Sequence, residues 1–171
     1  MTAYAALLRA VNVGGTGKLP MADLKAICEA AGLTQVRTYI ASGNVVFTSD
    51  QPEAAVRKAI EAPLAAYAGK PVGVLVRSAA EMAQVLADNP FVDRPANRTV
   101  ALFIDEPIPS DAIGAARNVK DEQLRLGKRA IYIFYGDGMA DSRIIIPAAK
   151  AGTARNMNTV AKLAAMAAAL T

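Results

Sequence analysis

The sequence contains no histidine, no tryptophan and a single cysteine, Cys28. Without histidine the chain has no Ser-His-Asp or Cys-His catalysis, no histidine general base and no histidine metal ligand. One cysteine excludes an intrachain disulfide, argues against zinc or iron–sulfur binding, and is typical of a reducing compartment. Carboxylate-bound Mg²⁺ stays open, although no acidic cluster favours it. We therefore expect no metal and no cofactor.

Long apolar runs are also missing. No run approaches the roughly 20 residues that span a bilayer. The first residues show no basic leader followed by an apolar stretch and a cleavage site. The alanine-rich C-terminal end is interrupted by Lys162 and is interpreted as an amphipathic helix. We expect a cytoplasmic protein with no membrane partner.

The composition that remains is that of a folded protein. Hydrophobic residues make up 53% of the chain and charged residues 20%, which excludes a disordered tail. The net charge of +4 is mildly basic. Such a charge is compatible with a phosphorylated or nucleic-acid partner but establishes neither.

Periodicity and turn residues predict an α+β fold. Up to residue 77 the predicted order is β-α-β-β-α-β, the ferredoxin-like arrangement. Its elements are a strand at 3–11, a helix at 20–31, strands at 36–41 and 45–48, a helix at 52–67 and a strand at 72–77. We expect Pro63 to kink the second helix or end it early.

The rest of the chain begins to repeat this order. Ser78 and Glu81 form the pattern of a capping box at the start of a third helix. The elements predicted after it are strands at 99–104, 123–126 and 130–135, a short helix from Pro109, and helical pieces that end with a helix at about 155–170. We predict two ferredoxin-like (βαββαβ-type) halves with antiparallel sheets, residues 1–77 and 78–171, plus C-terminal helices. The halves form separate domains or one compact unit, and the element order suggests a diverged duplication.

Three motifs resemble one family. Residues 7–15 read LLRAVNVGG, residues 37–47 read RTYIASGNVVF and residues 153–163 read TARNMNTVAKL. They resemble the bacterial family known as domain of unknown function 1697, whose members typically read LLRGINVGG, RTYIQSGNVVF and TTRNWNTVLKL. The chain departs from these patterns at Ala10, Ala41 and Met157. The resemblance implies a fold and an uncharacterised bacterial family, but no activity.

A glycine-rich loop follows the first strand. It is a poor Walker A motif, because Asn12 stands where the first glycine is required and Leu19 replaces the Mg²⁺-binding hydroxyl. A looser interpretation is an anion-binding nest formed with the start of the next helix. Its residues would be Asn12, Gly14, Gly15, Gly17 and Lys18. The alternative is a turn that only connects strand and helix.

Other candidates lie on the strands of the first half. Arg9 is a lone charge in an apolar strand, and Arg37 and Arg77 lie on two further strands. These arginines form a basic floor if they share one face of the sheet, whereas salt bridges to the other half are the favoured alternative. Ser42 and Asn44 present a hydroxyl and an amide to a ligand, or they serve only a tight turn.

The last predicted helix carries a polar stripe. Arg155, Asn158, Thr159 and Lys162 recur at helical spacing, and Asn156 lies beside them. Arg155, Asn156, Asn158 and Lys162 near the helix start would help to hold an anion. The alternative is a solvated face opposite a packed one.

We therefore predict a protein that binds a small anionic or phosphorylated ligand. One alternative is a nucleic-acid module that contacts the phosphate backbone, since Tyr4 and Phe47 alone make a poor base-stacking platform. Another is a protein-interaction module without a ligand. Enzymatic activity stays open and would depend on Lys, Arg, Asp, Glu, Ser or Tyr. The oligomeric state is not predicted.

Overall fold

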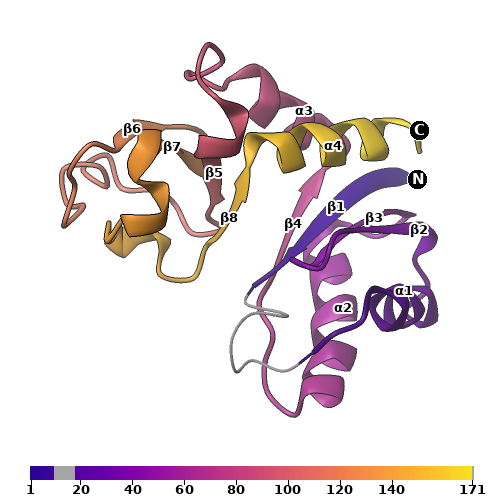
Figure 1. The fold of residues 1–171 in the computed structure, drawn as a ribbon. Coiled ribbons are helices and arrows are strands. Elements are labelled where there is room, and N and C mark those ends of the chain that lie inside the picture. Colours follow the sequence, from indigo (N-terminus) through magenta and orange to yellow (C-terminus); the bar gives the residue numbers. More distant parts are fainter. Residues whose placement is uncertain (10–17, 171) are drawn as a thin grey trace. The chain divides into compact units, whose positions relative to one another are not determined.

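The computed structural model describes residues 1–9 and 18–170. They form two four-stranded antiparallel sheets with helices (Figure 1), which confirms the predicted α+β class. The strands and α-helices are β1 (Thr2–Leu8), α1 (Met21–Ala30), β2 (Thr34–Tyr39), β3 (Asn44–Ser49), α2 (Glu53–Ala68), β4 (Val74–Ser78), α3 (Ala79–Ala87), β5 (Thr99–Phe103), β6 (Gln123–Leu126), β7 (Ala130–Phe134), β8 (Thr153–Asn156) and α4 (Met157–Ala168). Short 3₁₀ helices cover Ala96–Arg98, Gly136–Asp141 and Pro147–Ala149.

The chain divides into two compact units. The first consists of Met1–Ala83 together with the chain from Leu163 onward, and the second of Gln84–Lys162. The division therefore falls inside α3 and again inside α4.

In the first unit, the sheet has the strand order β2-β3-β1-β4. Side chains alternate along each strand, so Tyr4, Ala6 and Leu8 of β1 share one face. That face forms a core with buried side chains of α1 and α2. The core residues from the two helices are Leu24, Cys28, Val56, Ile60 and Leu64. Figure 1 shows both helices on the same side of β1.

Pro63 does not end α2 early, which was one of the two effects expected from sequence. The helix continues to Ala68 and ends at Gly69, which adopts the left-handed conformation with φ 70°. Ile60 and Leu64, on either side of the proline, are fully buried. Packing of this stripe against the sheet outweighs the hydrogen bond that proline removes.

The second unit repeats the strand order, as β6-β7-β5-β8, but not the helices. The short helix expected from Pro109 is a series of turns, and most of the helix expected after β7 is 3₁₀ helix and loop. The expected helix at 155–170 begins at Met157, because β8 occupies the residues before it. These turns still cover one face of the sheet, with Ala112 and Ile146 in its core.

The two sheets also share a register. In each sheet, an arginine of the last strand (β4 or β8) pairs with an alanine of the first strand (β1 or β5). A second arginine lies in the edge strand on the opposite side (β2 or β6). The cross-strand rows are Arg37–Val46–Ala5–Arg77 in the first sheet and Arg125–Tyr132–Ala101–Arg155 in the second. This residue-level equivalence supports the duplication that element order alone suggested.

Candidate functional site

Three candidate residues of the first unit, Arg9, Ser42 and Asn44, lie where β1 ends, whereas Arg37 lies within β2 and pairs with Val46. Leu8 donates its backbone N–H to the carbonyl of Gly43, and Arg9 donates to that of Gly73, both at 2.9 Å. The end of β1 thus lies between the β2–β3 turn and the start of β4. Two of the three sequence motifs, as far as the structure describes them, therefore meet at one end of this sheet.

Arg9 has a defined place there. Its side chain is half-buried. A Cβ added at Gly73 would lie 3.1 Å from Cδ of Arg9, so the glycine leaves room for the aliphatic part of the arginine. This packing holds the stem of Arg9 against the start of β4 and restricts where its guanidinium reaches.

Ser42 and Asn44 serve the turn. The amide nitrogen of Asn44, which is fully buried, donates to the carbonyl of Tyr39 at 3.1 Å and to Oγ of Ser42 at 2.9 Å. The turn interpretation therefore accounts for the Asn44 amide group. Ser42 itself is exposed.

The charge at this end of the sheet is positive. Among the described residues near this end, 5–9, 18–22, 37–44 and 69–75, there is no aspartate or glutamate, whereas they include Arg9, Lys18, Arg37 and Lys70. Lys18 is exposed just before α1. The nearest acid along the chain, Asp23, accepts a hydrogen bond of 2.7 Å from the hydroxyl of Tyr67. That bond and burial raise the pKa of Tyr67.

In the second unit an ion pair lies at the equivalent end of the sheet. The N–H of Ile104 bonds the carbonyl of Arg129 at 2.9 Å, as that of Leu8 bonds Gly43. Oδ1 of the next residue, Asp105, lies 3.2 Å from Nη2 of Arg129, so the carboxylate and the guanidinium form an ion pair. In the first unit the residues at these two positions are Arg9 and Gly43. Sequence reasoning missed this contrast, which depends on the common register.

Arg155 and Asn156 lie on β8, not on the last helix as predicted. Arg155 is 7% exposed, and its Nη1 donates to Oγ1 of Thr153 at 2.7 Å and to the carbonyl of Ala154 at 2.9 Å. Burial lowers the pKa of Arg155 to about 10, so it is still charged at neutral pH. Oδ1 of Asn156 accepts the N–H of Thr159 at 2.9 Å, which makes Asn156 the N-cap of α4.

The predicted polar stripe on the last helix is only partly present. Asn158 and Lys162 are exposed, but Thr159 is buried. Arg155 precedes the helix, so it does not lie on that stripe. Asn12, Gly14, Gly15 and Gly17 of the loop lie outside the described residues. Convergence of the loop, the sheet end and the start of α4 on one site stays a prediction.

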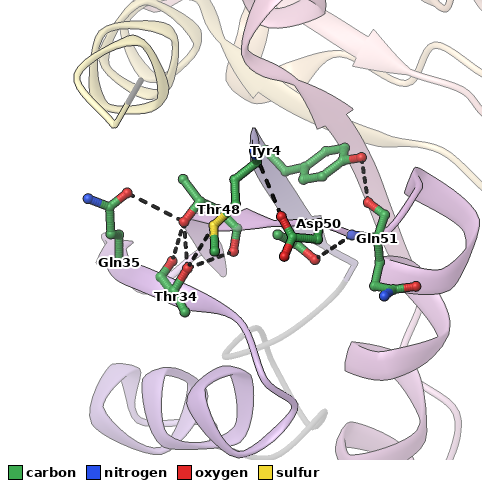
Figure 2. A network of polar contacts seen from close by, with 8 residues as sticks. Tyr4, Thr34, Gln35, Thr48, Asp50 and Gln51 are labelled. Carbon is green, nitrogen blue, oxygen red and sulfur yellow. Dashed lines mark hydrogen bonds and ion pairs between the residues drawn. The ribbon is translucent and has the colours of Figure 1, made fainter.

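A second polar cluster lies at the opposite end of the first sheet (Figure 2). The hydroxyls of Thr34 and Thr48 are 2.6 Å apart, and Thr48 is buried. The N-terminal amino group lies 3.8 Å from Oδ1 of Asp50, and the hydroxyl of Tyr4 donates to the carbonyl of Gln51 at 2.8 Å. These contacts join β1, β2 and β3 where β1 begins. Sequence reasoning missed the cluster, and its internal hydrogen bonds indicate a structural role.

Cys28 is a core residue. It is fully buried, and burial together with the charge of Glu29 raises its pKa to about 12. A thiol with so high a pKa is a poor nucleophile at neutral pH.

Within residues 1–9 and 18–170, no group of three or more His, Cys, Asp or Glu side chains is placed to hold a metal ion. Over the same residues, every helix is too short or too polar to cross a bilayer.

Together the two sheets and their shared register define an α+β protein built from two repeated halves. The chain belongs to the family described as protein of unknown function (DUF1697), whose model matches residues 1–132. It is similar to a solved structure, the conserved bacterial protein SP0830 from Streptococcus pneumoniae. The two are 28% identical with a TM-score of 0.79, over 96% of this chain and 98% of that one. No match is found among curated proteins.

Proposed function

We propose that the protein binds a small anionic or phosphorylated ligand at the end of the first sheet, where β1 meets the β2–β3 turn. The observation that carries the proposal is the charge of this end. The described residues near it include the cations Arg9, Lys18 and Lys70, and the carboxylate of Asp23, which follows Lys18 in the chain, is hydrogen-bonded to Tyr67. A cluster of one sign raises the local concentration of oppositely charged ligands.

The contrast with the second unit supports this assignment. There, the carboxylate of Asp105 neutralises Arg129 at the equivalent sheet end. In the first unit the position of Asp105 is taken by a cation, Arg9, and that of Arg129 by Gly43. The two ends share their backbone hydrogen bond but differ in charge, so the positive charge is not a requirement of the fold.

The side chains available suit a phosphate or carboxylate. A guanidinium such as that of Arg9 donates two parallel hydrogen bonds to such a group, whereas Lys18 adds a mobile point charge. The exposed hydroxyl of Ser42 is a further donor. The residues proposed to complete the site are Asn12, Gly14, Gly15, Arg37, Asn44, Arg155, Asn156, Asn158 and Lys162.

Thermal shift with inorganic phosphate, sugar phosphates and nucleotides tests the proposal. A ligand present at 100 times its Kd stabilises the native state by about 2.7 kcal/mol. Lys18→Ala and Arg9→Gln should remove most of that shift, because each removes one positive charge from the site. Lys58→Ala is the matched control, since Lys58 is an exposed cation on α2.

Two outcomes contradict the proposal. One is the absence of a shift with every anion, and the other is an equal loss of the shift in Lys58→Ala and Lys18→Ala. Binding of oligonucleotides that weakens steeply with salt, and that all three variants reduce alike, would favour the nucleic-acid alternative.

A further inference from the structure

Ile40, the first residue of the β2–β3 turn, adopts an uncommon backbone conformation. Its φ is 51°, in the left-handed region. A β-branched residue rarely occupies that region, because its side chain crowds the backbone. The side chain is also 48% exposed, so burial in the core does not compensate for the strain. Strained residues of this kind occur frequently at ligand sites.

The turn that contains Ile40 is longer than its counterpart in the second unit. Tyr39 pairs with Asn44, which leaves residues 40–43 in the turn. In the second unit the N–H of Gly127 bonds the carbonyl of Ala130 at 2.8 Å, which leaves only residues 128–129. A two-residue turn therefore suffices to join the equivalent strands, so hairpin formation does not require the additional residues.

The turn also lies beside the proposed anion site. The N–H of Gly43 bonds the carbonyl of Ile40 at 3.4 Å, and the carbonyl of Gly43 accepts the N–H of Leu8 at 2.9 Å. Arg9 is the next residue, directly after the end of β1. An exposed aliphatic side chain and a guanidinium are therefore carried by segments that are hydrogen-bonded to each other.

We propose that Ile40 is the apolar contact of a ligand that carries both an anionic group and an apolar ring, as a nucleoside phosphate does. The inference rests on the proposed function and adds a ligand class to it. The anionic group is held by Arg9 and Lys18, and the flat face of the ring packs on the aliphatic side chain of Ile40. In the complex, the favourable contact between the ring and the side chain of Ile40 offsets the energetic cost of the strained backbone.

The test compares AMP, ribose 5-phosphate and inorganic phosphate by calorimetry. For the wild type we expect AMP to bind about tenfold more tightly than ribose 5-phosphate, because its base buries apolar surface. Ile40→Gly should abolish this preference and leave the affinity for inorganic phosphate unchanged. It should also raise the melting temperature by about 2–4 °C, since glycine adopts a positive φ without strain.

Ala41→Gly is the matched control, because it loosens the same turn without removing the aliphatic side chain. It should keep the preference for AMP. A preference that persists in Ile40→Gly overturns the inference, and so does equal binding of AMP and ribose 5-phosphate by the wild type. If the wild type binds none of the three probes, the proposed function and this inference are overturned together.

Discussion

Arg77 and Arg155 occupy the same position in their respective sheets. Arg77 pairs with Ala5 and Arg155 with Ala101, on the first strand of each sheet. Both arginines are buried, with exposed fractions of 1% and 7%. Each donates from Nη1 to the carbonyl of the residue before it, at 2.8 Å for Arg77 and 2.9 Å for Arg155. A buried arginine on the fourth strand is therefore a shared element of both halves.

The first prediction concerns the stabilising role of Arg77. The N–H of Arg9 bonds the carbonyl of Gly73, and the backbone groups of β4 that face β1 recur at every second residue. The carbonyl of Val76, three residues after Gly73, therefore points away from β1, toward the edge of the sheet. Arg77→Ala should lower the free energy of unfolding by about 2–3 kcal/mol, through loss of this buried contact and a cavity. Arg37→Ala, an exposed arginine in the same cross-strand row, should change it by about 0.5 kcal/mol or less. Urea denaturation measures both, and equal losses would contradict the prediction.

The second prediction concerns the N-cap of α4. Asn156→Ala should lower the free energy of unfolding by about 1 kcal/mol, because the N–H of Thr159 loses its acceptor. Asn158→Ala is the matched control, since Asn158 is exposed in the first turn of the same helix. A comparison of urea midpoints distinguishes the two. If Asn156→Ala is as stable as Asn158→Ala, the capping bond contributes nothing.

The third prediction is a loss of stability at alkaline pH that depends on Cys28. The folded thiol has its pKa raised to about 12, whereas an unfolded thiol ionises near about 8.5. Above that lower pKa the unfolded state releases the proton first, so stability falls as pH rises toward 12. Between pH 8 and pH 10 the wild type should lose about 2 kcal/mol more than Cys28→Ala.

Denaturant unfolding at the two pH values measures this difference. The pKa of Tyr132, raised to about 12 mainly by burial, lowers stability in the same direction, but Tyr132 is present in both proteins and cancels. Native protein should also resist thiol alkylation at pH 8 and react fully in urea. Rapid alkylation of the native protein would contradict the burial of Cys28.

The fourth prediction concerns Gly152, just before β8. A Cβ at this position would lie 2.5 Å from the backbone oxygen of Phe103, on β5, and 3.3 Å from that of Ala149. Gly152→Ala should therefore force β5 and β8 apart and lower the free energy of unfolding by about 1–3 kcal/mol. At Gly114 the added Cβ would make an ordinary contact of 3.6 Å, so Gly114→Ala should be nearly neutral. Thermal unfolding of both variants measures the difference.

The elements of the first unit could be predicted because their patterns are local. The stripes of α1 and α2 recur at helical spacing, and glycines lie at their ends. The capping box at the start of α3 is confirmed, since Ser78 and Glu81 exchange two hydrogen bonds of 3.1 Å. Each of these features depends on residues a few positions apart, which a sequence displays directly.

The second unit was harder to predict because its strands depend on distant partners. β8 has only four residues, and its sequence, Thr-Ala-Arg-Asn, carries no alternation that distinguishes a strand from the start of a helix. It becomes a strand by pairing with β5 about fifty residues earlier in the chain. The sequence pattern therefore places Arg155 and Asn156, both functional candidates, on the wrong element.

The α+β class, the first six elements, the family resemblance and the absence of histidine chemistry could be predicted from the sequence alone. These follow from composition and from short-range periodicity. The three-dimensional structure was needed to show that Arg77 and Arg155 are equivalent, that Asp105 pairs with Arg129 and that Ile40 is strained at an exposed turn. Cross-strand register and backbone dihedral angles arise from pairing between distant segments, and a linear pattern does not contain them.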